Sequence, residues 1–187
     1  METLEKLFGS SARIKMMRLF IFNPDNIFDS KTIAKKTRVK SDTVRREVSL
    51  LISSGLIKRK TTGYALNQGF DLLQPLQYLL TFNGPIAPED LIKRVGKSGQ
   101  IKLIVISGIF TEQWDGRVDL LIVGNKIRKS LLEGILRGVE AEVGKDLRYA
   151  ALDTVDFTYR LGIGDKLIRD VFDYPHKVIY DKIGLSH

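Results

Sequence analysis

Residues 108–124 read GIFTEQWDGRVDLLIVG and contain residue types from which a nucleotide-and-metal site can be built. Such a site combines a glycine at a strand end, a turn, and a second strand that opens on a carboxylate. Carboxylate oxygens hold hard divalent cations, and two cations need more than one acid to organise a displacement at phosphorus. Here Arg117 stands two residues before Asp119, where a second acid is needed. The stretch is therefore either an active site or the remains of one.

The composition is that of an ordinary soluble globular protein, because 43% of the 187 residues are hydrophobic and 28% are charged. A chain of this length can form one large or two small domains. It contains no cysteine, which excludes disulfides, thiolate metal sites and cysteine nucleophiles. Its two histidines, His176 and His187, do not favour a zinc site. We therefore expect no metal and no cofactor.

The sequence carries no pattern typical of a membrane protein. Its longest apolar runs, near residues 103–106 and 120–123, have the length of strands and are too short to span a bilayer. The N-terminal stretch METLEKLFGSSARIK lacks the long apolar core of a signal peptide. We expect a cytoplasmic protein that does not bind a membrane.

The net charge of +8 lies entirely in the first third of the chain. Residues 1–65 carry 14 lysines and arginines against six acids, whereas residues 66–187 carry 16 of each kind. A neutral two-thirds joined to a basic third indicates two modules, and the basic module favours a polyanion as its partner. The alternative is a solvated basic surface that serves only solubility.

Hydrophobic periodicity in the basic third predicts three helices followed by a hairpin. The first helix covers residues 12–22, Asp29-Ser30 can cap a short second one, and the third begins near Ser41. The apolar residues of the third helix fall on one stripe: Val44, Val48, Leu51 and Ile52. Strands at 56–60 and 64–66, joined by a tight turn, complete the module.

The segment IAKKTRVKSDTVRREVSLLISSGLIKRK, residues 33–60, resembles the winged helix-turn-helix of bacterial and archaeal transcription regulators. The match is carried by Ile33-Ala34 on the second helix, Val39 in the turn, Thr43-Val44 and Arg46-Glu47-Val48 on the third helix, and Gly55-Leu56-Ile57 at the entry to the wing. In this family the third helix lies in the major groove of double-stranded DNA. The resemblance implies that these residues face or border the DNA: Lys40, Ser41, Asp42, Thr43, Arg45, Arg46, Lys58, Arg59 and Lys60.

The chemistry of arginine agrees with this assignment. Arg45 and Arg46 project away from the apolar stripe, and arginine suits both guanine edges and phosphates. The alternative is a pair of solvated charges on a helix surface. The segment departs from the family at Arg38, where the turn usually holds glycine because its backbone tends toward positive φ. The helix is capped by Lys40 or by Ser41.

A leucine-rich stretch at residues 71–82 predicts a connecting helix with Leu72, Leu73, Leu76, Leu79 and Leu80 turned inward. Pro75 favours a late start or a kink. Such a helix either forms dimer or interdomain contacts or packs on its own domain. We expect a DNA-binding domain at 1–68, a helical connector at 69–96 and a second domain at 97–187.

The second domain reads as an α/β layer fold. Residues 101–106 and 118–123 are nearly all apolar, as strands covered on both faces are, and 147–152 is a third strand. The longest helix lies between Asn125 and Gly144, and two more helices precede a small edge strand at 177–180.

The order of these elements and the phrase "Gly-x-Phe-Thr … Val-Asp-Leu-Leu-Ile-Val-Gly … Glu-Val-Gly-Lys-Asp-Leu-Arg-Tyr" resemble the small nucleotidyltransferase fold found behind winged-helix domains. The resemblance implies an α+β chain, in which an N-terminal winged helix-turn-helix precedes a small α/β domain with a mixed sheet. In active members a Gly-Ser pair receives the triphosphate, two aspartates separated by one residue hold divalent metal, and a later strand supplies a third acid.

Compared residue by residue, this chain retains little of that site. Gly108 matches the glycine, but Ile109 offers no hydroxyl at the serine position. Asp119 matches the second metal aspartate, but Arg117 stands at the first, and its charge opposes cation binding. The strand at 147–152 contains no acid. We therefore expect a vestigial nucleotide site at Gly108, Arg117 and Asp119 that neither holds metal nor catalyses.

Two alternatives remain for the acids of this stretch. Asp115 is a possible substitute ligand, but it lies in the turn before Gly116. Asp119 is either a structural acid paired with Arg117 or part of a pocket that binds without catalysing.

Taken together, these patterns predict a sequence-specific, double-stranded DNA-binding transcriptional regulator that is a homodimer and not an enzyme. Its second domain would serve dimerisation, or the sensing of a small ligand or partner protein. The first alternative is an active nucleotidyltransferase that uses its basic domain to dock a nucleic-acid or protein substrate. The second is an antitoxin-like or scaffold protein whose neutral domain binds a partner protein.

Overall fold

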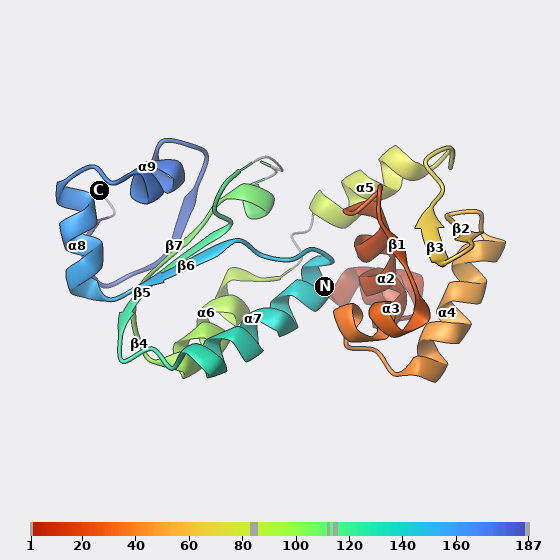
Figure 1. The fold of residues 1–187 in the computed structure, drawn as a ribbon, viewed down its shortest axis with the longest axis horizontal. Coiled ribbons are helices and arrows are strands. Elements are labelled where there is room, and N and C mark those ends of the chain that lie inside the picture. The colour runs from red at the N-terminus through yellow and green to blue at the C-terminus, as the bar shows by residue number, and fades with distance from the viewer. Residues whose placement is uncertain (1, 83–85, 112, 114–115, 186–187) are drawn as a thin grey trace. The chain divides into compact units, whose positions relative to one another are not determined.

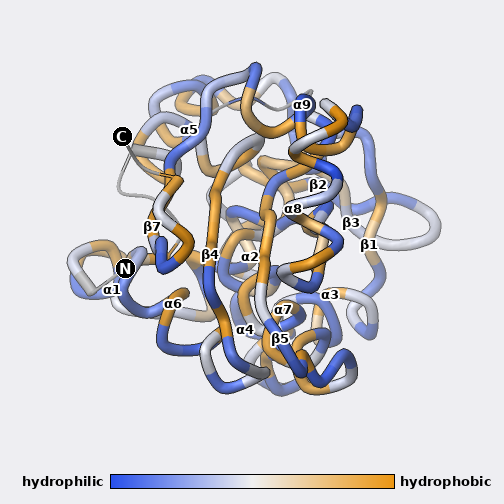
Figure 2. The backbone as a smooth tube through the Cα atoms, turned by 90° about the vertical axis from the view of Figure 1, so that its left-hand side faces the viewer, coloured by the Kyte–Doolittle hydropathy of each residue, from blue (hydrophilic) through white to orange (hydrophobic). Residues whose placement is uncertain are grey.

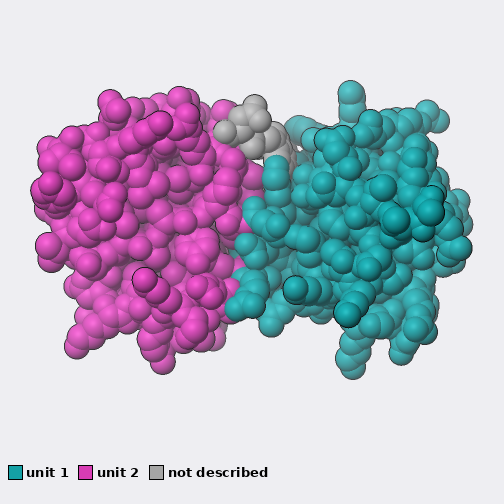
Figure 3. Space-filling model, viewed as in Figure 1, with its two compact units in different colours: residues 1–86, 137–146 teal, residues 87–136, 147–187 magenta. Residues whose placement is uncertain are grey.

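A computed structural model describes residues 2–82, 86–111, 113 and 116–185. The chain forms two compact units (Figure 3): residues 1–86 with 137–146, and residues 87–136 with 147–187. The fold is α+β, with a helical first unit that carries a small antiparallel sheet and a second unit built on a mixed sheet (Figure 1). None of the described helices has the length and apolar character needed to cross a membrane.

The first unit contains five helices of its own among the described residues, together with a three-stranded sheet. Its helices are α1 (Glu2–Phe8), α2 (Ser11–Ile21), α3 (Ser30–Thr37), α4 (Ser41–Ser53) and α5 (Leu73–Phe82). Its strands are β1 (Ile27–Phe28), β2 (Ile57–Lys60) and β3 (Gly63–Leu66), arranged in the order β1-β3-β2 with antiparallel pairing. The C-terminal half of α7 (Lys129–Val143) also belongs to this unit.

Local capping explains where the first helices begin. The Ser10 side chain accepts a hydrogen bond from the Arg13 backbone N–H at the start of α2, and Asp29 accepts one from Thr32 at the start of α3. Each bond satisfies an N–H group that has no partner inside its helix. The hydrogen bonds from Thr32 lower the pKa of Asp29, which keeps this cap ionised.

The core of the first unit encloses a buried arginine. Arg18 on α2 is fully buried and donates hydrogen bonds to the backbone carbonyls of Leu80 on α5, at 3.1 Å, and Glu142 on α7, at 3.0 Å. Both carbonyls lie in the last turns of their helices, where C=O groups lack helical partners and the helix dipole is negative. Burial lowers the pKa of Arg18 to about 10, and the charge of Glu142 opposes part of this shift. The guanidinium is therefore still charged at neutral pH.

The second unit is built on a four-stranded mixed sheet in the order β6-β5-β4-β7. Strand β4 pairs antiparallel with β5 and β7, whereas β5 and β6 are parallel. The strands are β4 (Gln100–Ile106), β5 (Leu120–Asn125), β6 (Tyr149–Leu152) and β7 (Lys177–Asp181). The helical elements are α6 (Pro88–Val95), η1 (Gly96–Ser98), η2 (Gly108–Thr111), the N-terminal half of α7, α8 (Thr154–Gly162) and α9 (Lys166–Phe172).

Both faces of this sheet are covered, which explains why its central strands are almost entirely apolar. Leu103 and Leu121 belong to a buried cluster with Phe157 of α8 and Val171 of α9. Ile104 alternates with these residues along β4, faces the other side, and is also fully buried. Figure 2 shows the hydrophobic colour along β5 and part of β4.

The strong periodic elements were predicted correctly, including the longest helix and the edge strand β7. The prediction missed α1 and the two-residue strand β1, which are too short to show a period. It was wrong about the five leucines of residues 71–82, because Leu72 lies before α5 and is 61% exposed, and only Leu80 of the five is fully buried. The late start that Pro75 favoured is observed, because α5 begins at Leu73 and not at residue 71.

Gly144, which follows α7, provides a test of how the buried arginine is packed. Its φ is +81°, and a Cβ there would lie 2.6 Å from the backbone carbon of Arg18. We expect Gly144→Ala to lower the free energy of unfolding by about 2–4 kcal/mol, from left-handed strain together with overpacking. Chemical denaturation would measure this change. Gly134→Ala, inside α7 and with open space around its Cβ, is the control and should be neutral or stabilising. Equal stability of the two variants would contradict this account.

Candidate functional site

Helix α4 presents a polar, cationic outer face above a buried apolar stripe. Val44, Val48 and Leu51 are buried, at 0%, 4% and 2% exposure. The predicted DNA-facing residues of this segment lie on the other side: Lys40, Ser41, Asp42, Arg45 and Arg46 are exposed, and Thr43 is half-buried. The prediction left the cap open between two residues, and the structure places it at Lys40, with no side-chain hydrogen bond.

The cations of this face are only weakly engaged by their own helix. The Arg45 side chain is 76% exposed and lies 3.5 Å from the Asp42 carboxylate, which is itself 88% exposed. Arg46 donates to the Thr43 hydroxyl at 3.4 Å. Exposed pairs at such distances contribute little to stability, so both guanidinium groups can turn to an external acceptor at small cost.

A partly buried ion pair fixes α4 to the start of α2. The Glu47 carboxylate accepts hydrogen bonds from the Ser10 hydroxyl and from Arg13 Nε, both at 2.8 Å. The Glu47 side chain is 11% exposed and that of Arg13 is 26% exposed, so solvent screens this pair less than a surface pair. Glu47 thus helps to hold the inner side of the helix whose outer side carries Arg45 and Arg46.

The β2–β3 hairpin lies beside α4 and adds a second cluster of cations (Figure 1). Lys58, Arg59 and Lys60 are all exposed on β2. Arg59 pairs in register with Tyr64 on β3, and its guanidinium carbon lies 5.9 Å from the centre of the tyrosine ring. This cation–π contact restrains Arg59 while leaving its donors accessible.

The turn between α3 and α4 has the backbone geometry that the winged-helix resemblance predicted. Arg38 ends α3 in the left-handed conformation, with φ 55° and ψ 37°. A non-glycine residue pays a steric penalty there, and the turn is retained because both flanking helices are packed. Ile33 before it and Val44 after it are each fully buried.

In the second unit, Asp119 is saturated by hydrogen bonds from the protein itself. Its side chain is fully buried, and Oδ1 accepts from the Ile109 backbone N–H at 3.1 Å and from Arg148 Nη2 at 3.0 Å. Oδ2 accepts from the backbone N–H of Arg148 at 2.8 Å and from its Nε at 3.1 Å. Each carboxylate oxygen offers about two acceptor sites, so the four bonds use the whole capacity of the group.

The other two residues of the predicted vestigial site serve different contacts. Gly108 has φ +54°, and a Cβ there would clash with Asp119 Oδ1, so glycine allows the close approach. Arg117 is 64% exposed and pairs with Asp170 at 3.5 Å. The expected pairing of Asp119 with Arg117 is therefore wrong, and Arg148 is the partner. Arg117 and Asp170 instead line an open cavity of about 250 Å³ with Ser107 and Tyr174.

The predicted substitute ligand, Asp115, lies outside the described residues. Within the described part of the chain, no group of three or more His, Cys, Asp or Glu side chains is placed to hold a metal ion. Comparisons of the chain with protein-family models, with curated proteins and with solved structures found no match. The function is therefore inferred from the chain's own residues and their geometry.

Two residues that organise these sites were missed by the sequence reasoning. The helical motif that contains Glu47 does not show its pairing with Arg13, although an acid between the buried Val44 and Val48 indicates a partner inside the unit. The pairing of Arg148 with Asp119 is not visible in a comparison of the metal-binding acids alone. The signal that could have identified Arg148 is its position at the start of a strand. That strand follows the apolar 118–123 stretch and the helix after it.

The contacts of Asp119 predict a structural role for this acid. We expect Asp119→Asn to lower the unfolding free energy of the second unit by about 2–4 kcal/mol, because an amide NH2 would face the Arg148 donors. This is less than the cost of breaking a fully buried pair, since the Arg148 side chain is 43% exposed. Arg117→Ala, which breaks the exposed pair with Asp170, should cost about 1 kcal/mol or less. Thermal unfolding of both variants is the measurement, and an unaltered Asp119→Asn protein would refute the structural role.

Proposed function

We propose that this protein is a sequence-specific, double-stranded DNA-binding transcriptional regulator. The observation that carries the proposal is the outer face of α4, where Lys40, Arg45 and Arg46 are exposed above a fully buried apolar stripe. A helix in this state is fixed on one side and cationic on the other, as a major-groove reading helix must be.

The surrounding elements favour a winged helix-turn-helix. Helices α3 and α4 are joined by a tight turn at Arg38, and the hairpin β2–β3 follows α4 directly. In such a module α4 enters the major groove, and Lys58, Arg59 and Lys60 on the hairpin contact the neighbouring phosphates. The guanidinium groups of Arg45 and Arg46 can each donate two hydrogen bonds to the O6 and N7 acceptors of guanine. Such contacts would supply sequence specificity.

For the second unit we propose a nucleotidyltransferase-like domain without catalytic activity, which serves dimerisation or ligand sensing. The saturation of Asp119 by Arg148 and Ile109 supports this role, because a metal ion would have to displace bonds at both carboxylate oxygens. Arg148 also places a fixed positive charge where a divalent cation would bind.

A homodimer is part of this proposal. The stretch 72–87 contains no charged residue, and Leu72 on its exposed side is 61% exposed. An uncharged apolar surface suits a second copy of the same chain, because two basic units would otherwise repel each other. The two copies would bind half-sites whose centres lie about 34 Å apart, or a multiple of that distance.

The arginines of α4 give the direct test. We expect Arg45→Ala with Arg46→Ala to weaken binding to selected genomic DNA by about tenfold or more, because each base-edge interaction is worth about 1–3 kcal/mol. The slope of log affinity against log salt should also become shallower by about 0.9 for each phosphate that the variant no longer neutralises. Fluorescence anisotropy over a salt series measures both quantities.

The matched control removes the same number of charges elsewhere. Lys166 and Arg169 are exposed on α9 in the second unit, so Lys166→Ala with Arg169→Ala should leave the affinity nearly unchanged. If the α4 variant binds DNA as tightly as the unaltered protein, α4 is not the reading helix. If both double variants weaken binding equally, the interaction depends only on net charge.

The absence of catalysis is tested with labelled nucleoside triphosphates and Mg²⁺. We expect no transfer of label to the protein, to nucleic acid or to a second protein, because Asp119 is held by four internal hydrogen bonds. Label transfer that disappears in Asp119→Asn would favour the alternative of an active nucleotidyltransferase. Circular dichroism of that variant must first show that it is folded at the assay temperature.

A further inference from the structure

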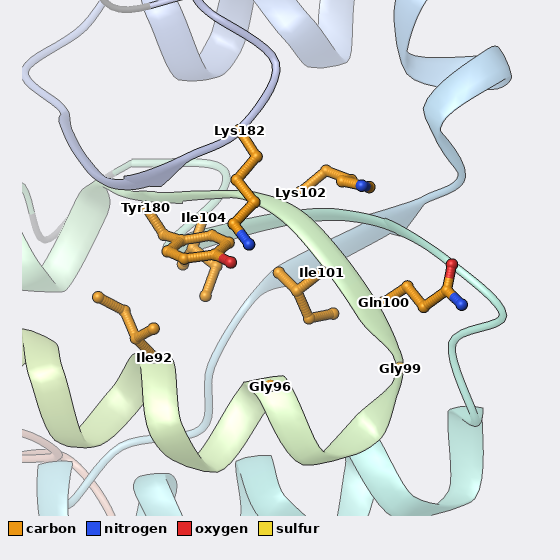
Figure 4. A pocket seen from close by; sticks show the side chains of 9 residues that line it. All are labelled: Ile92, Gly96, Gly99, Gln100, Ile101, Lys102, Ile104, Tyr180 and Lys182. Carbon is orange, nitrogen blue, oxygen red and sulfur yellow. The ribbon is translucent and has the colours of Figure 1, made fainter.

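A second cavity in the second unit lies beside the edge strand β7 (Figure 4), and Asp119 is not among its lining residues. Its volume is about 310 Å³, at the lower end of the range of about 300–1,000 Å³ found for small-molecule sites. The lining residues come from α6, η1, β4 and the edge strand β7 with the residue after it: Ile92, Gly96, Gly99, Gln100, Ile101, Lys102, Ile104, Tyr180 and Lys182. The cavity thus combines an apolar wall with polar groups.

The charged side chains that line this cavity are both cationic. Lys102 and Lys182 line it, and none of the nine lining residues is an acid. The nearest acid in sequence, Asp181, accepts hydrogen bonds from the backbone N–H groups of residues 183, 184 and 185 in the turn after β7. Within the described part of the chain, neither lining lysine forms an ion pair.

The apolar side of the cavity offers a flat surface beside one of these charges. The Lys182 ammonium lies 5.7 Å from the centre of the Tyr180 ring, and Figure 4 shows it above that ring. Ile104, which lies beside the ring in Figure 4, is fully buried and Ile101 is 8% exposed, so these two lining side chains are held in place. A planar group can lie against these residues while an anionic substituent reaches the lysines.

The rim of the cavity is bonded to the residue that precedes the longest helix. Arg128 donates from its backbone N–H to the Ser98 carbonyl at 2.8 Å, and from its side chain to the Lys97 carbonyl at 2.6 Å. Helix α7 begins at the next residue and supplies residues to both units. A ligand that alters the η1 turn would therefore act on the start of this helix.

From these observations we propose that the cavity binds a small organic anion, namely a phosphate or carboxylate carried on a planar ring. This inference rests on the sensing role proposed above and names the ligand class for it. The planar part contacts Tyr180 and Ile92, and the anionic group is bound by Lys182, with Lys102 adding positive charge at the rim of the cavity. Both lysines are accessible from solvent, so an anion can enter without unfolding the sheet.

Phenyl phosphate is the probe, because it joins a planar ring to a phosphate. We expect a saturable titration of the full chain, followed by NMR, in which the shifted backbone amides are those of residues 96, 99–102 and 180–182. Inorganic phosphate and benzyl alcohol each supply only one part of the ligand and should bind more weakly. Because no DNA is present, the result is independent of whether the chain binds DNA.

Three variants locate the binding. Gly96 has helical backbone angles and open space around its Cβ, so Gly96→Leu should fill the cavity without strain and abolish the titration. Lys102→Gln with Lys182→Gln should weaken binding about tenfold or more, since hydrogen bonds to charged groups are worth about 1.5–3 kcal/mol. Lys97→Gln removes a neighbouring exposed lysine that does not line the cavity and should leave binding unchanged.

The proposal is overturned if millimolar phenyl phosphate produces no saturable shift at these amides. It is also overturned if Gly96→Leu binds as well as the unaltered protein, or if Lys97→Gln weakens binding as much as the paired lysine variant. In the last case the anion would be attracted by general positive charge and not by this cavity.

Discussion

The first unit depends on one buried cation, the guanidinium of Arg18. It joins α2 to the carbonyl ends of α5 and α7, elements that are 62 and 124 residues away along the chain. Removing a guanidinium from water is costly, and only hydrogen bonds and favourable charge recover that cost. The negative helix ends and Glu142 supply both, so the three helices are held at one point. Gly144 lies against the Arg18 backbone because no side chain fits there.

The DNA-reading helix in our proposal is fixed by the same helix α2. Arg13 lies five residues before Arg18 and binds Glu47, which is on the inner side of α4. Helix α2 thus binds α5 and α7 through Arg18 and binds α4 through Arg13. Because Glu47 and the apolar stripe restrain α4, its exposed arginines are presented by a rigid support. Such preorganisation reduces the ordering cost of binding.

Most of the regular elements could be predicted from the sequence, because periodic apolar residues such as Val44, Val48 and Leu51 are local signals. The left-handed turn at Arg38 was expected only from the winged-helix resemblance, whereas the capping of α3 by Asp29 was a local signal and was predicted. The contacts of Arg18, Glu47 and Arg148 were not, since each joins residues at least 29 positions apart. No periodicity reports which distant carbonyl or carboxylate an arginine will meet. The short elements α1 and β1 also lack a period and exist through tertiary packing.

The arginines of this chain show why residue type alone does not define a site. Arg148 donates several hydrogen bonds to a fully buried carboxylate, so its charge stabilises the fold of the second unit. Arg45 meets only an exposed aspartate at 3.5 Å, and its side chain remains 76% exposed. The first arrangement neutralises a buried carboxylate, whereas the second leaves a cation available to a polyanion. Burial and partner, which the sequence does not reveal, separate an arginine that stabilises from one that can bind.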